Sequence, residues 1–375
     1  MHGTLLDAAR KTVPTLSANA ARTERELKPA PDSVEAVRDA GLFALTVPSE
    51  AGGHGVDQHV LVEVIAELGR GCPSTAWVVG LCAANKSLIS AVGSDAARAA
   101  LLADPNGVAC ASSVGQSSRG ERVPGGLRFS GRWAMASGSE LASWAMVMVS
   151  LSGETPPAVC PSLVPVADLS IERTWKAAGL AGTSSHTIVA VDVFVPESLV
   201  SFPGSGSMPS PELTFTGGLA ALASMIGATR GAQDVVAAAI ADNRAPYATT
   251  YARVADSPLG RYWFTEALRR TDSAMRRTLQ VADAIDALAP GESMPVTERI
   301  RLRVELSTAA RECREAMELL LDLHGASGFA EDNPLQRFWR DVAVGTRHPY
   351  FTPYILAEDH GRLTFDVMPT VSGML

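Results

Sequence analysis

The chain has 375 residues, of which 46% are hydrophobic and 19% are charged, a composition that is typical of a globular protein and excludes wholesale disorder. The formal net charge is −8 and no run of Lys or Arg is present, which argues against nucleic-acid binding. The five cysteines are dispersed without zinc-site spacing, and no signal peptide or stretch of membrane-spanning length is visible. We therefore expect a reduced, metal-free protein of the cytoplasm that does not enter a membrane.

Residues 1–107 are predicted to form a helical domain. Apolar residues recur at helical spacing in Leu5–Arg25 and in Val56–Leu68, as expected for amphipathic helices. Pro31 is predicted to begin a second helix, because proline suits the first helical position. Pro73–Val92 is rich in alanine and apolar on most faces, so we expect it to be a central, buried helix.

Residues 108–205 change to short β-rich runs that are separated by Gly, Pro and Ser turns. Short strands at such spacing predict a sandwich or a barrel. The runs are Val108–Ala111, Leu127–Ser130, Trp144–Leu151, Ser162–Val166 and Thr187–Val195. A segment rich in Pro, Gly and Ser at 202–209 resembles a linker.

Residues 206–375 return to a helical pattern, with long periodic segments at Leu219–Ala241, Pro258–Leu288 and Thr297–His324. The order is therefore helices, then strands, then helices. Segregated runs of this kind predict an α+β protein and not an alternating βαβ sheet.

General catalytic motifs are missing from the sequence. It contains no Walker loop, no HExxH and no GxSxG. Gly204-Ser205-Gly206 could begin a dinucleotide-binding loop, but Pro209 stands where the third glycine belongs and no strand precedes it. A Rossmann site is therefore not expected.

Four local signatures, taken in order, resemble the acyl-CoA dehydrogenase superfamily. They are Leu42–Gly55, Phe129–Trp144, Gly179–Pro196 and His324–Asp341. The resemblance covers nearly all of residues 20–360. It implies an N-terminal helical domain at 1–107, a middle β-sandwich or barrel at 108–205 and a C-terminal four-helix bundle at 206–375.

The resemblance also implies residues beside a flavin ring. Ser137 occupies the position whose hydroxyl bonds flavin N5; the alternative is a serine that caps a strand-end turn. Ser112 and Ser113, at the end of the first predicted strand, would edge the ring similarly. Trp77 is expected to pack in the core or against rings, as buried tryptophans do.

Two further positions are implied for the flavin phosphates. Arg244 falls where the family carries an arginine for them, although a solvated arginine at a helix end is an equal alternative. Gly325, Ala326 and Gly328 form a turn in which glycine permits close approach and exposed N–H groups suit an anion. The alternative for this turn is a plain connection between helices with glycine C-caps.

The sequence departs from the dehydrogenase branch of the family. A dehydrogenase needs a carboxylate to remove the proton α to a thioester. One branch places a glutamate nine residues after the arginine of Arg340-Asp341, where this chain has Pro349. A second branch places it in the helix that opens the C-terminal domain, where Thr216–Leu219 has none and Glu212 is several residues early.

Trp339–His348 instead resembles the two-component flavin monooxygenases, which carry W-R-D-x-x-V-G-x-x-H there. In that group the histidine reaches the flavin C4a edge, so His348 is implied as a donor to a C4a-hydroperoxide and as an acid–base group. The alternative is a histidine at a helix end that interacts favourably with the helix dipole. A second histidine of that group is Asn85 here, which can hydrogen-bond but cannot exchange a proton. His186 is a further candidate, for which a structural role is favoured.

The resemblance implies a monooxygenase that accepts reduced flavin, FADH2 or FMNH2, from a separate NAD(P)H:flavin reductase. With O2 and a C4a-(hydro)peroxyflavin it would hydroxylate or N-oxygenate a small organic substrate, aromatic or a natural-product intermediate. The alternatives are an acyl-CoA dehydrogenase or desaturase with a displaced base, and a non-catalytic scaffold that has lost its flavin. A homotetramer, or at least a dimer, is expected, because the family assembles through its C-terminal helices and Leu219–Ala241 is apolar enough to need a partner.

Overall fold

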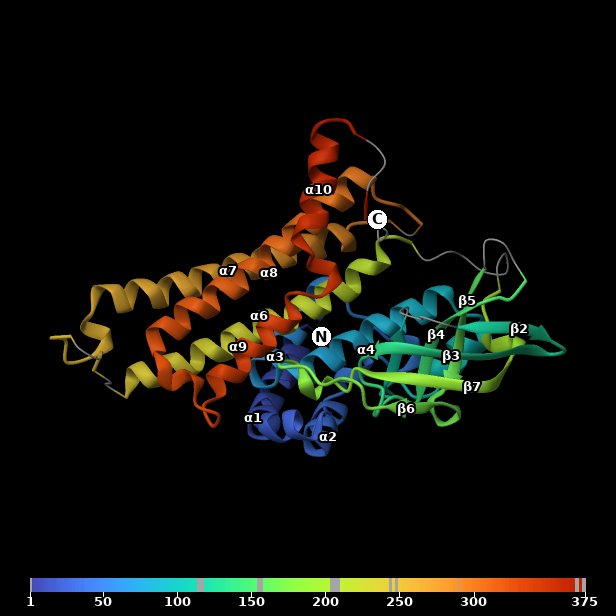
Figure 1. Cartoon of the computed structure of the whole chain (residues 1–375), viewed down its shortest axis with the longest axis horizontal. Coiled ribbons are helices and arrows are strands. Elements are labelled where there is room, and N and C mark those ends of the chain that lie inside the picture. The colour runs from blue at the N-terminus through green and yellow to red at the C-terminus, as the bar shows by residue number, and fades with distance from the viewer. Residues whose placement is uncertain are drawn as a thin grey trace.

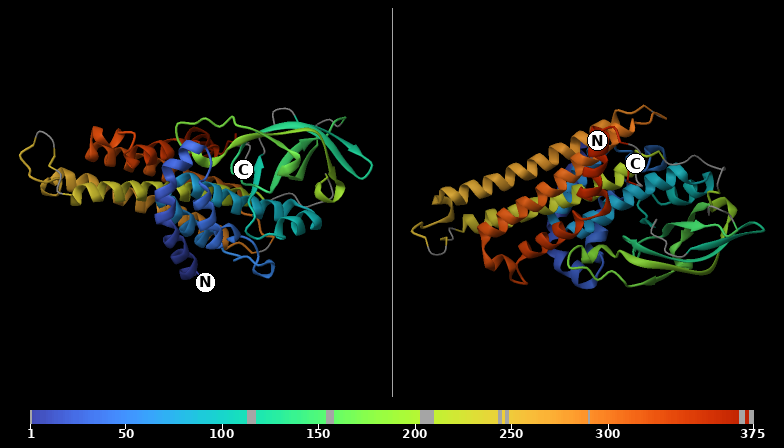
Figure 2. Two further views of the ribbon diagram at one scale, coloured as in Figure 1. Left: turned by 90° about the horizontal axis from the view of Figure 1, so that it is seen from below. Right: turned by 45° about the horizontal axis from the view of Figure 1, so that its top comes forward.

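The structure is a computed structural model that describes residues 2–112, 118–153, 158–202, 210–242, 245–246, 249–289, 291–367 and 371–372. Within these ranges the chain forms five α-helices, then two β-sheets, then five further α-helices (Figure 1). The sheets lie at one end of the molecule, and the connection from α6 to α7 lies at the opposite end (Figure 2). This confirms the α+β order expected from the sequence.

The N-terminal helices begin where the sequence offers start signals. They are α1 (His2–Glu26), α2 (Pro31–Asp39), α3 (Gln58–Gly71), α4 (Pro73–Val92) and α5 (Asp95–Leu102). Prolines open α2 and α4 at the position where the missing N–H is not needed. Asp57 caps α3 by accepting a hydrogen bond from Val60 N at 2.8 Å. The short α5, which the periodicity did not reveal, is capped in the same way by Ser94.

α4 is the buried central helix that its composition predicts. Its length and mean hydropathy would let it cross a membrane, which differs from the expectation that no stretch is long enough. However, 67% of the apolar stretch of 18 residues within this helix is buried inside the protein. The helix packs against α3 and α6 and against β1 (Ala109–Ser112). Its apolar faces are therefore covered by the chain itself.

The middle region consists of two sheets that share one core. The strands after β1 are β2 (Arg119–Val123), β3 (Gly126–Ala136), β4 (Trp144–Ser150), β5 (Val159–Pro165), β6 (Ser170–Glu172) and β7 (His186–Pro196). One sheet has the order β1-β4-β5 and the other β2-β3-β7-β6. Leu127, Trp133 and Val147 belong to one buried cluster that draws on both sheets. The predicted sandwich is confirmed, with β2 and β6 as strands that the pattern did not reveal.

The C-terminal region is built around one long helix. Its helices are α6 (Leu213–Ala241), α7 (Pro258–Asp286), α8 (Val296–His324), α9 (Pro334–Gly345) and α10 (Pro353–Thr364). α6 contacts α7, α8 and α9, which gives the expected bundle, and α10 packs on α8 (Figure 1). α6 also crosses α3 and α4, so it ties the bundle to the N-terminal helices.

The crossing of α3 and α6 depends on small residues. A Cβ added to Gly227 would lie 2.1 Å from Ala66 O, and one added to Gly69 would lie 2.6 Å from Ser224 O. The two backbones can therefore approach each other only with glycine at these positions. The buried residues of α6 are covered by helices of the same chain. Its apolar face, which suggested a partner subunit, thus gives no argument for an oligomer.

Candidate active site

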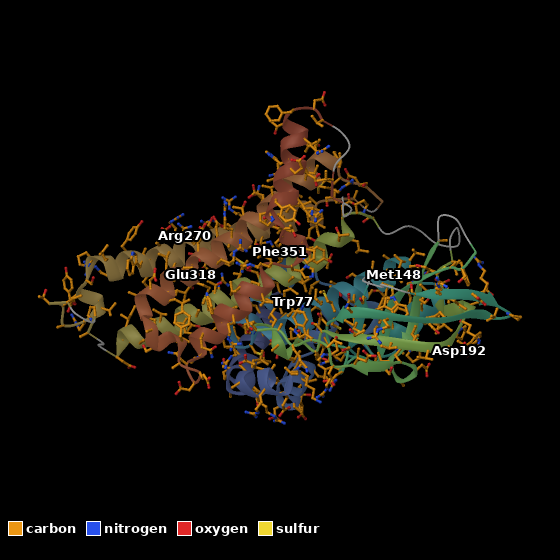
Figure 3. All side chains as sticks on the ribbon, viewed as in Figure 1. Trp77, Met148, Asp192, Arg270, Glu318 and Phe351 are labelled. Atoms are coloured by element: carbon orange, nitrogen blue, oxygen red, sulfur yellow. The ribbon has the colours of Figure 1, made fainter. Side chains whose placement is uncertain are left out.

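Trp77, Ser137 and His348 lie together where the three regions of the chain meet. Trp77 belongs to α4, Ser137 directly follows β3, and His348 lies three residues beyond α9. Nε1 of Trp77 donates a hydrogen bond to Ser137 Oγ at 3.3 Å. The indole also packs edge-on against the imidazole of His348, with ring centroids 5.6 Å apart. Figure 3 shows Trp77 at this junction between helices and sheets. Two residues expected from the sequence are thus joined through a tryptophan.

The imidazole of His348 is held among aromatic rings. The centroids of the Tyr350 and Phe351 rings lie 4.6 Å and 6.4 Å from it. Burial lowers the pKa of His348 from 6.5 to about 4, so the ring is neutral at pH 7. Tyr350 N donates to Nδ1 at 3.4 Å, which leaves the proton of the neutral ring on Nε2. His348 therefore offers a neutral N–H donor, and protonation of the free ring requires acid.

Ser137 is the first member of a chain of hydroxyl groups. Its Oγ lies 2.7 Å from Ser185 Oγ, and Ser185 Oγ lies 2.7 Å from Thr183 Oγ1. Thr183 in turn donates to the carbonyl oxygen of Leu180 at 2.8 Å. Ser185 and Thr183 are buried, whereas Ser137 is only half-buried. Sequence reasoning missed Ser185 and Thr183, although the run of hydroxyl residues in the Gly179–Pro196 signature was a visible signal.

Asn85 and Ser112 hold the strands beside this site. Nδ2 of Asn85 donates to Ala109 O of β1 at 3.3 Å. Ser112 ends β1, and its Oγ donates to Ala134 O of β3 at 2.6 Å. Among the described residues, no hydrogen bond or ring contact joins Asn85 to His348. Ser113, the other serine expected near the ring, lies outside the described residues.

His186 is the first residue of β7 and pairs with Ala136, next to Ser137, across the sheet. It is fully buried, and its Nδ1 accepts a hydrogen bond from Trp175 N at 3.3 Å. Burial lowers the pKa of the ring. Nε2 has no hydrogen-bond partner in the part of the chain that the structure describes. The position next to Ser137 keeps His186 close to the site, while its backbone partner fits the structural role favoured from the sequence.

The glycine turn lies at the other end of α9 from His348. Gly325 directly follows α8 and has φ 79°, a value that favours glycine, and Ala326–Phe329 forms a single 3₁₀ turn. A Cβ on Gly328 would lie 3.2 Å from His324 Nδ1. The 12 residues of α9 separate this turn from His348 by about 18 Å. Arg244, the other residue expected at the flavin phosphates, lies outside the described residues.

Two carboxylates, Glu212 and Asp341, accept hydrogen bonds from backbone N–H groups. Oε1 of Glu212 accepts hydrogen bonds from Met294 N at 2.8 Å and from Ser293 Oγ at 3.0 Å, so this buried group ties the start of α6 to the segment before α8. Oδ1 of Asp341 accepts from Leu180 N at 2.5 Å, and burial raises the pKa of Asp341 to about 7. The structure therefore gives Glu212 an anchoring role and not that of a displaced dehydrogenase base.

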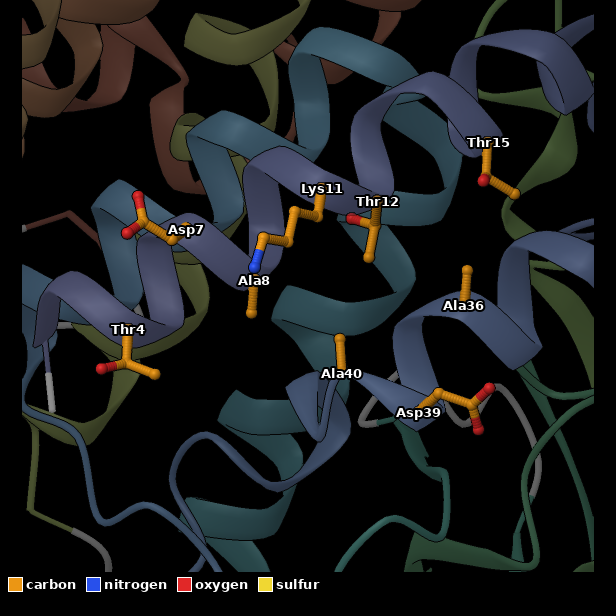
Figure 4. Close-up of a pocket in the computed structure, with 9 residues that line it drawn as sticks. All are labelled: Thr4, Asp7, Ala8, Lys11, Thr12, Thr15, Ala36, Asp39 and Ala40. Atoms are coloured by element: carbon orange, nitrogen blue, oxygen red, sulfur yellow. The ribbon is translucent and has the colours of Figure 1, made fainter.

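Two cavities differ in their relation to these residues. One of about 540 Å³ lies between α1 and α2 (Figure 4). Its lining residues are Thr4, Asp7, Ala8, Lys11, Thr12, Thr15, Ala36, Asp39 and Ala40. It shares no residue with the candidate site, and we assign no chemistry to it. A second, of about 10 Å³, is lined by Arg303 and by Tyr350, the neighbour of His348, and has room for about one water molecule.

Comparisons with known proteins identify the family to which the chain belongs. Models of the acyl-CoA dehydrogenase N-terminal and C-terminal domains match residues 2–104 and 219–353. The chain is 30% identical to the oxygenase subunit HsaA of a flavin-dependent monooxygenase from Rhodococcus jostii (strain RHA1), over 90% of this chain and 91% of that protein. It is 32% identical to the oxygenase component of an FADH2-dependent resorcinol hydroxylase from Rhizobium sp. (strain MTP-10005), over 90% and 88%.

Solved structures show the same fold over the whole chain. XiaF from Streptomyces sp., in complex with FADH2 and glycerol, superposes with a TM-score of 0.92 at 27% identity and covers 100% of this chain and 98% of its own. The 3-HSA hydroxylase from Rhodococcus sp. RHA1 superposes with a TM-score of 0.88 at 27% identity and covers 100% of both chains. The chain therefore belongs to the acyl-CoA dehydrogenase superfamily, among the oxygenase components of its flavin-dependent monooxygenases.

Proposed function

We propose that this protein takes reduced flavin, FADH2 or FMNH2, from a separate NAD(P)H:flavin reductase and uses it with O2 to oxygenate an aromatic small molecule. The observation that carries the proposal is the group of Ser137, Trp77 and His348, in which a hydroxyl oxygen and a neutral N–H lie on either side of one indole. Pro349 stands where a dehydrogenase has its glutamate, and Glu212 is held at the start of α6.

The residues present fit a flavin ring. Ser137 is half-buried, so its oxygen can meet a ligand while its hydroxyl is held by Ser185. We infer that Ser137 lies beside flavin N5, with Ser112 near the ring edge and His348 toward the side where oxygen is transferred. When bound, the flavin supplies the two electrons for the reduction of O2. The chain's own part is to orient the ring, to donate from His348 Nε2 and to exclude water.

An aromatic substrate is supported by the side chains and by the relatives. Trp77, Tyr350 and Phe351 surround His348, and such rings pack well against aromatic ligands. Relatives of this chain include the resorcinol hydroxylase component and an indole-3-acetate monooxygenase from Acinetobacter baumannii that is 25% identical over 90% of this chain. We therefore place phenols and indoles first among candidate substrates, with insertion at carbon or at nitrogen both allowed.

A homotetramer in the cytoplasm is part of the proposal. One chain places the glycine turn and His348 at opposite ends of α9, so a flavin that meets both groups would draw on two subunits. α7 exposes Leu259 and Tyr262, which are 63% and 62% accessible and could pack against a partner. The five cysteines are free and buried, which suits a reducing compartment. Light scattering should give about four times the chain mass of 39.3 kDa; a mass of one chain would refute the oligomer.

Transfer of isotopically labelled oxygen tests the function directly. Anaerobically reduced FAD or FMN is mixed with the protein, a panel of phenols and indoles, and labelled O2, and products are analysed by mass spectrometry. We expect one labelled oxygen atom in each product molecule and none without protein, because free reduced flavin yields hydrogen peroxide. Bleaching of bound oxidised flavin by an acyl-CoA without O2 would support the dehydrogenase alternative. Failure to bind either flavin in either redox state would support the scaffold.

A further inference from the structure

The hydroxyl chain that starts at Ser137 joins one group that can only donate to one that can only accept. At one end, the indole N–H of Trp77 donates to Ser137 Oγ. At the other end, the carbonyl oxygen of Leu180 accepts from Thr183. Between them lie three contacts, Ser137–Ser185, Ser185–Thr183 and Thr183–Leu180, with lengths of 2.7, 2.7 and 2.8 Å. The three hydroxyl groups supply one proton each.

Three protons for three contacts leave only one arrangement in which every contact is a hydrogen bond. The proton of Thr183 goes to Leu180 O, so Ser185 must donate to Thr183. The proton of Ser185 is then used, so Ser137 must donate to Ser185. Reversing any link would set two oxygen lone pairs against each other at buried groups, since Ser185 and Thr183 are 5% and 1% accessible, and burial makes an unmade hydrogen bond costly.

The backbone around the hydroxyl chain fixes the position of its end at Thr183 and Leu180. Leu180 and Ser184 both have positive φ, 52° and 51°, which is costly for residues other than glycine and must be held by neighbours. Leu180 N donates to Asp341, and Ser139 Oγ donates to Ser184 O at 2.8 Å. Gly138 N, next to Ser137, donates to Thr183 O at 2.9 Å. The direction of the hydroxyl chain is therefore built into the fold.

We propose that Ser185 and Thr183 are positioning residues that fix Ser137 as a hydrogen-bond acceptor and thereby favour reduced flavin over oxidised flavin. The inference rests on the proposed function, in which Ser137 lies beside N5. With its proton committed to Ser185 and one lone pair committed to Trp77, Ser137 has only a lone pair left for a ligand. Reduced flavin carries a hydrogen on N5 and can donate to it. Oxidised flavin presents a lone pair at N5 and is repelled.

The test measures flavin affinity in both redox states and not turnover. Dissociation constants of oxidised and of anaerobically reduced FAD and FMN are determined for the wild type and for Ser185→Ala and Thr183→Val. Both substitutions free the proton of Ser137 to turn toward N5. The ratio of the oxidised to the reduced constant should fall by roughly 2- to 10-fold, the range for one hydrogen bond. A tenfold fall equals a drop of about 30 mV in the two-electron potential of bound flavin.

The controls separate this inference from the proposed function. Thr183→Ser keeps the hydroxyl and should retain the wild-type ratio. Thr278→Val removes another buried hydroxyl, which donates to Ala274 O at 2.8 Å in α7, and should also leave the ratio unchanged. An unchanged ratio in Ser185→Ala and Thr183→Val, with a lowered ratio in Ser137→Ala, would overturn the inference alone. Unchanged affinities in Ser137→Ala as well would overturn the placement of Ser137 at N5. Ser185→Ala and Thr183→Val remove different hydroxyl groups, so the result of either variant can be interpreted by itself if the other does not fold.

Discussion

Replacing His348 by asparagine should remove a loss of stability that the wild type suffers in mild acid. Burial lowers the pKa of His348 from 6.5 to about 4. As the pH falls through 6.5 the unfolded chain takes up a proton at this ring, but the folded protein does not until about pH 4. The contribution of His348 to folding stability therefore decreases as the pH is lowered across this window. Since one pKa unit is worth about 1.4 kcal/mol, the decrease is about 3 kcal/mol at its limit.

Urea unfolding of the flavin-free protein between about pH 7.5 and pH 4.5 measures this effect. The free energy of unfolding of the wild type should drop more steeply with acid than that of His348→Asn, by most of the 3 kcal/mol derived above. His360→Asn is the matched control, because His360 is exposed on α10 and its replacement should not change the slope. Parallel curves for the wild type and His348→Asn would refute the claim that the folded site excludes the charged imidazole.

Four other substitutions test the site and its supports. His348→Ala should lower product formation by at least about 10²-fold, the lower figure for one positioned acid–base group, while O2 is still consumed and released as hydrogen peroxide; near wild-type coupling would make His348 structural. Ser137→Ala should weaken the binding of reduced flavin by roughly 2- to 10-fold and raise the release of hydrogen peroxide. An unchanged dissociation constant in equilibrium dialysis would contradict the contact between Ser137 and flavin N5. Burial raises the pKa of Asp341 to about 7, so ionisation of this carboxyl lowers folding stability as the pH rises from about 4 to 7, a contribution opposite in sign to that of His348, and Asp341→Asn should remove this contribution; equal pH slopes of the wild type and Asp341→Asn in urea would contradict this. Gly179→Ala should cost about 1–3 kcal/mol in thermal or urea unfolding, because its Cβ would lie 2.0 Å from Arg340 O; an unchanged midpoint would show that the segment can move away from α9.

The helices and the sheet region could be predicted largely because each long element repeats its pattern. α4 begins at Pro73 and ends at Val92, as its composition indicates. β2 (Arg119–Val123) and β6 (Ser170–Glu172) could not be found in this way. Both are short strands at the edges of the four-stranded sheet, and edge strands carry polar side chains that break the apolar pattern. Periodicity reports burial, and these strands are only partly buried.

The site was predictable only where it follows the family pattern. His348 and Ser137 stand at positions that the resemblance marks, and the structure brings them to opposite sides of Trp77, for which the sequence indicated only a packing role. Ser185 and Thr183 acquire their place from the left-handed backbone at Leu180 and Ser184. Leucine and serine do not favour the left-handed conformation, so residue propensities along the sequence do not predict this turn. Its stability comes from tertiary hydrogen bonds that a pattern along the chain cannot contain.

The polarity of this site is set by hydrogen-bond direction and not by charge. Desolvation alone accounts for the lowered pKa of His348, which leaves a neutral ring with its proton on Nε2. The hydroxyl chain leaves Ser137 as an acceptor. Trp77 lies between them, donating to Ser137 and presenting its ring to His348. A buried ion without a partner is costly because it loses its hydration. A neutral donor and a neutral acceptor, each fixed by neighbours on a different element, can orient a flavin without that penalty.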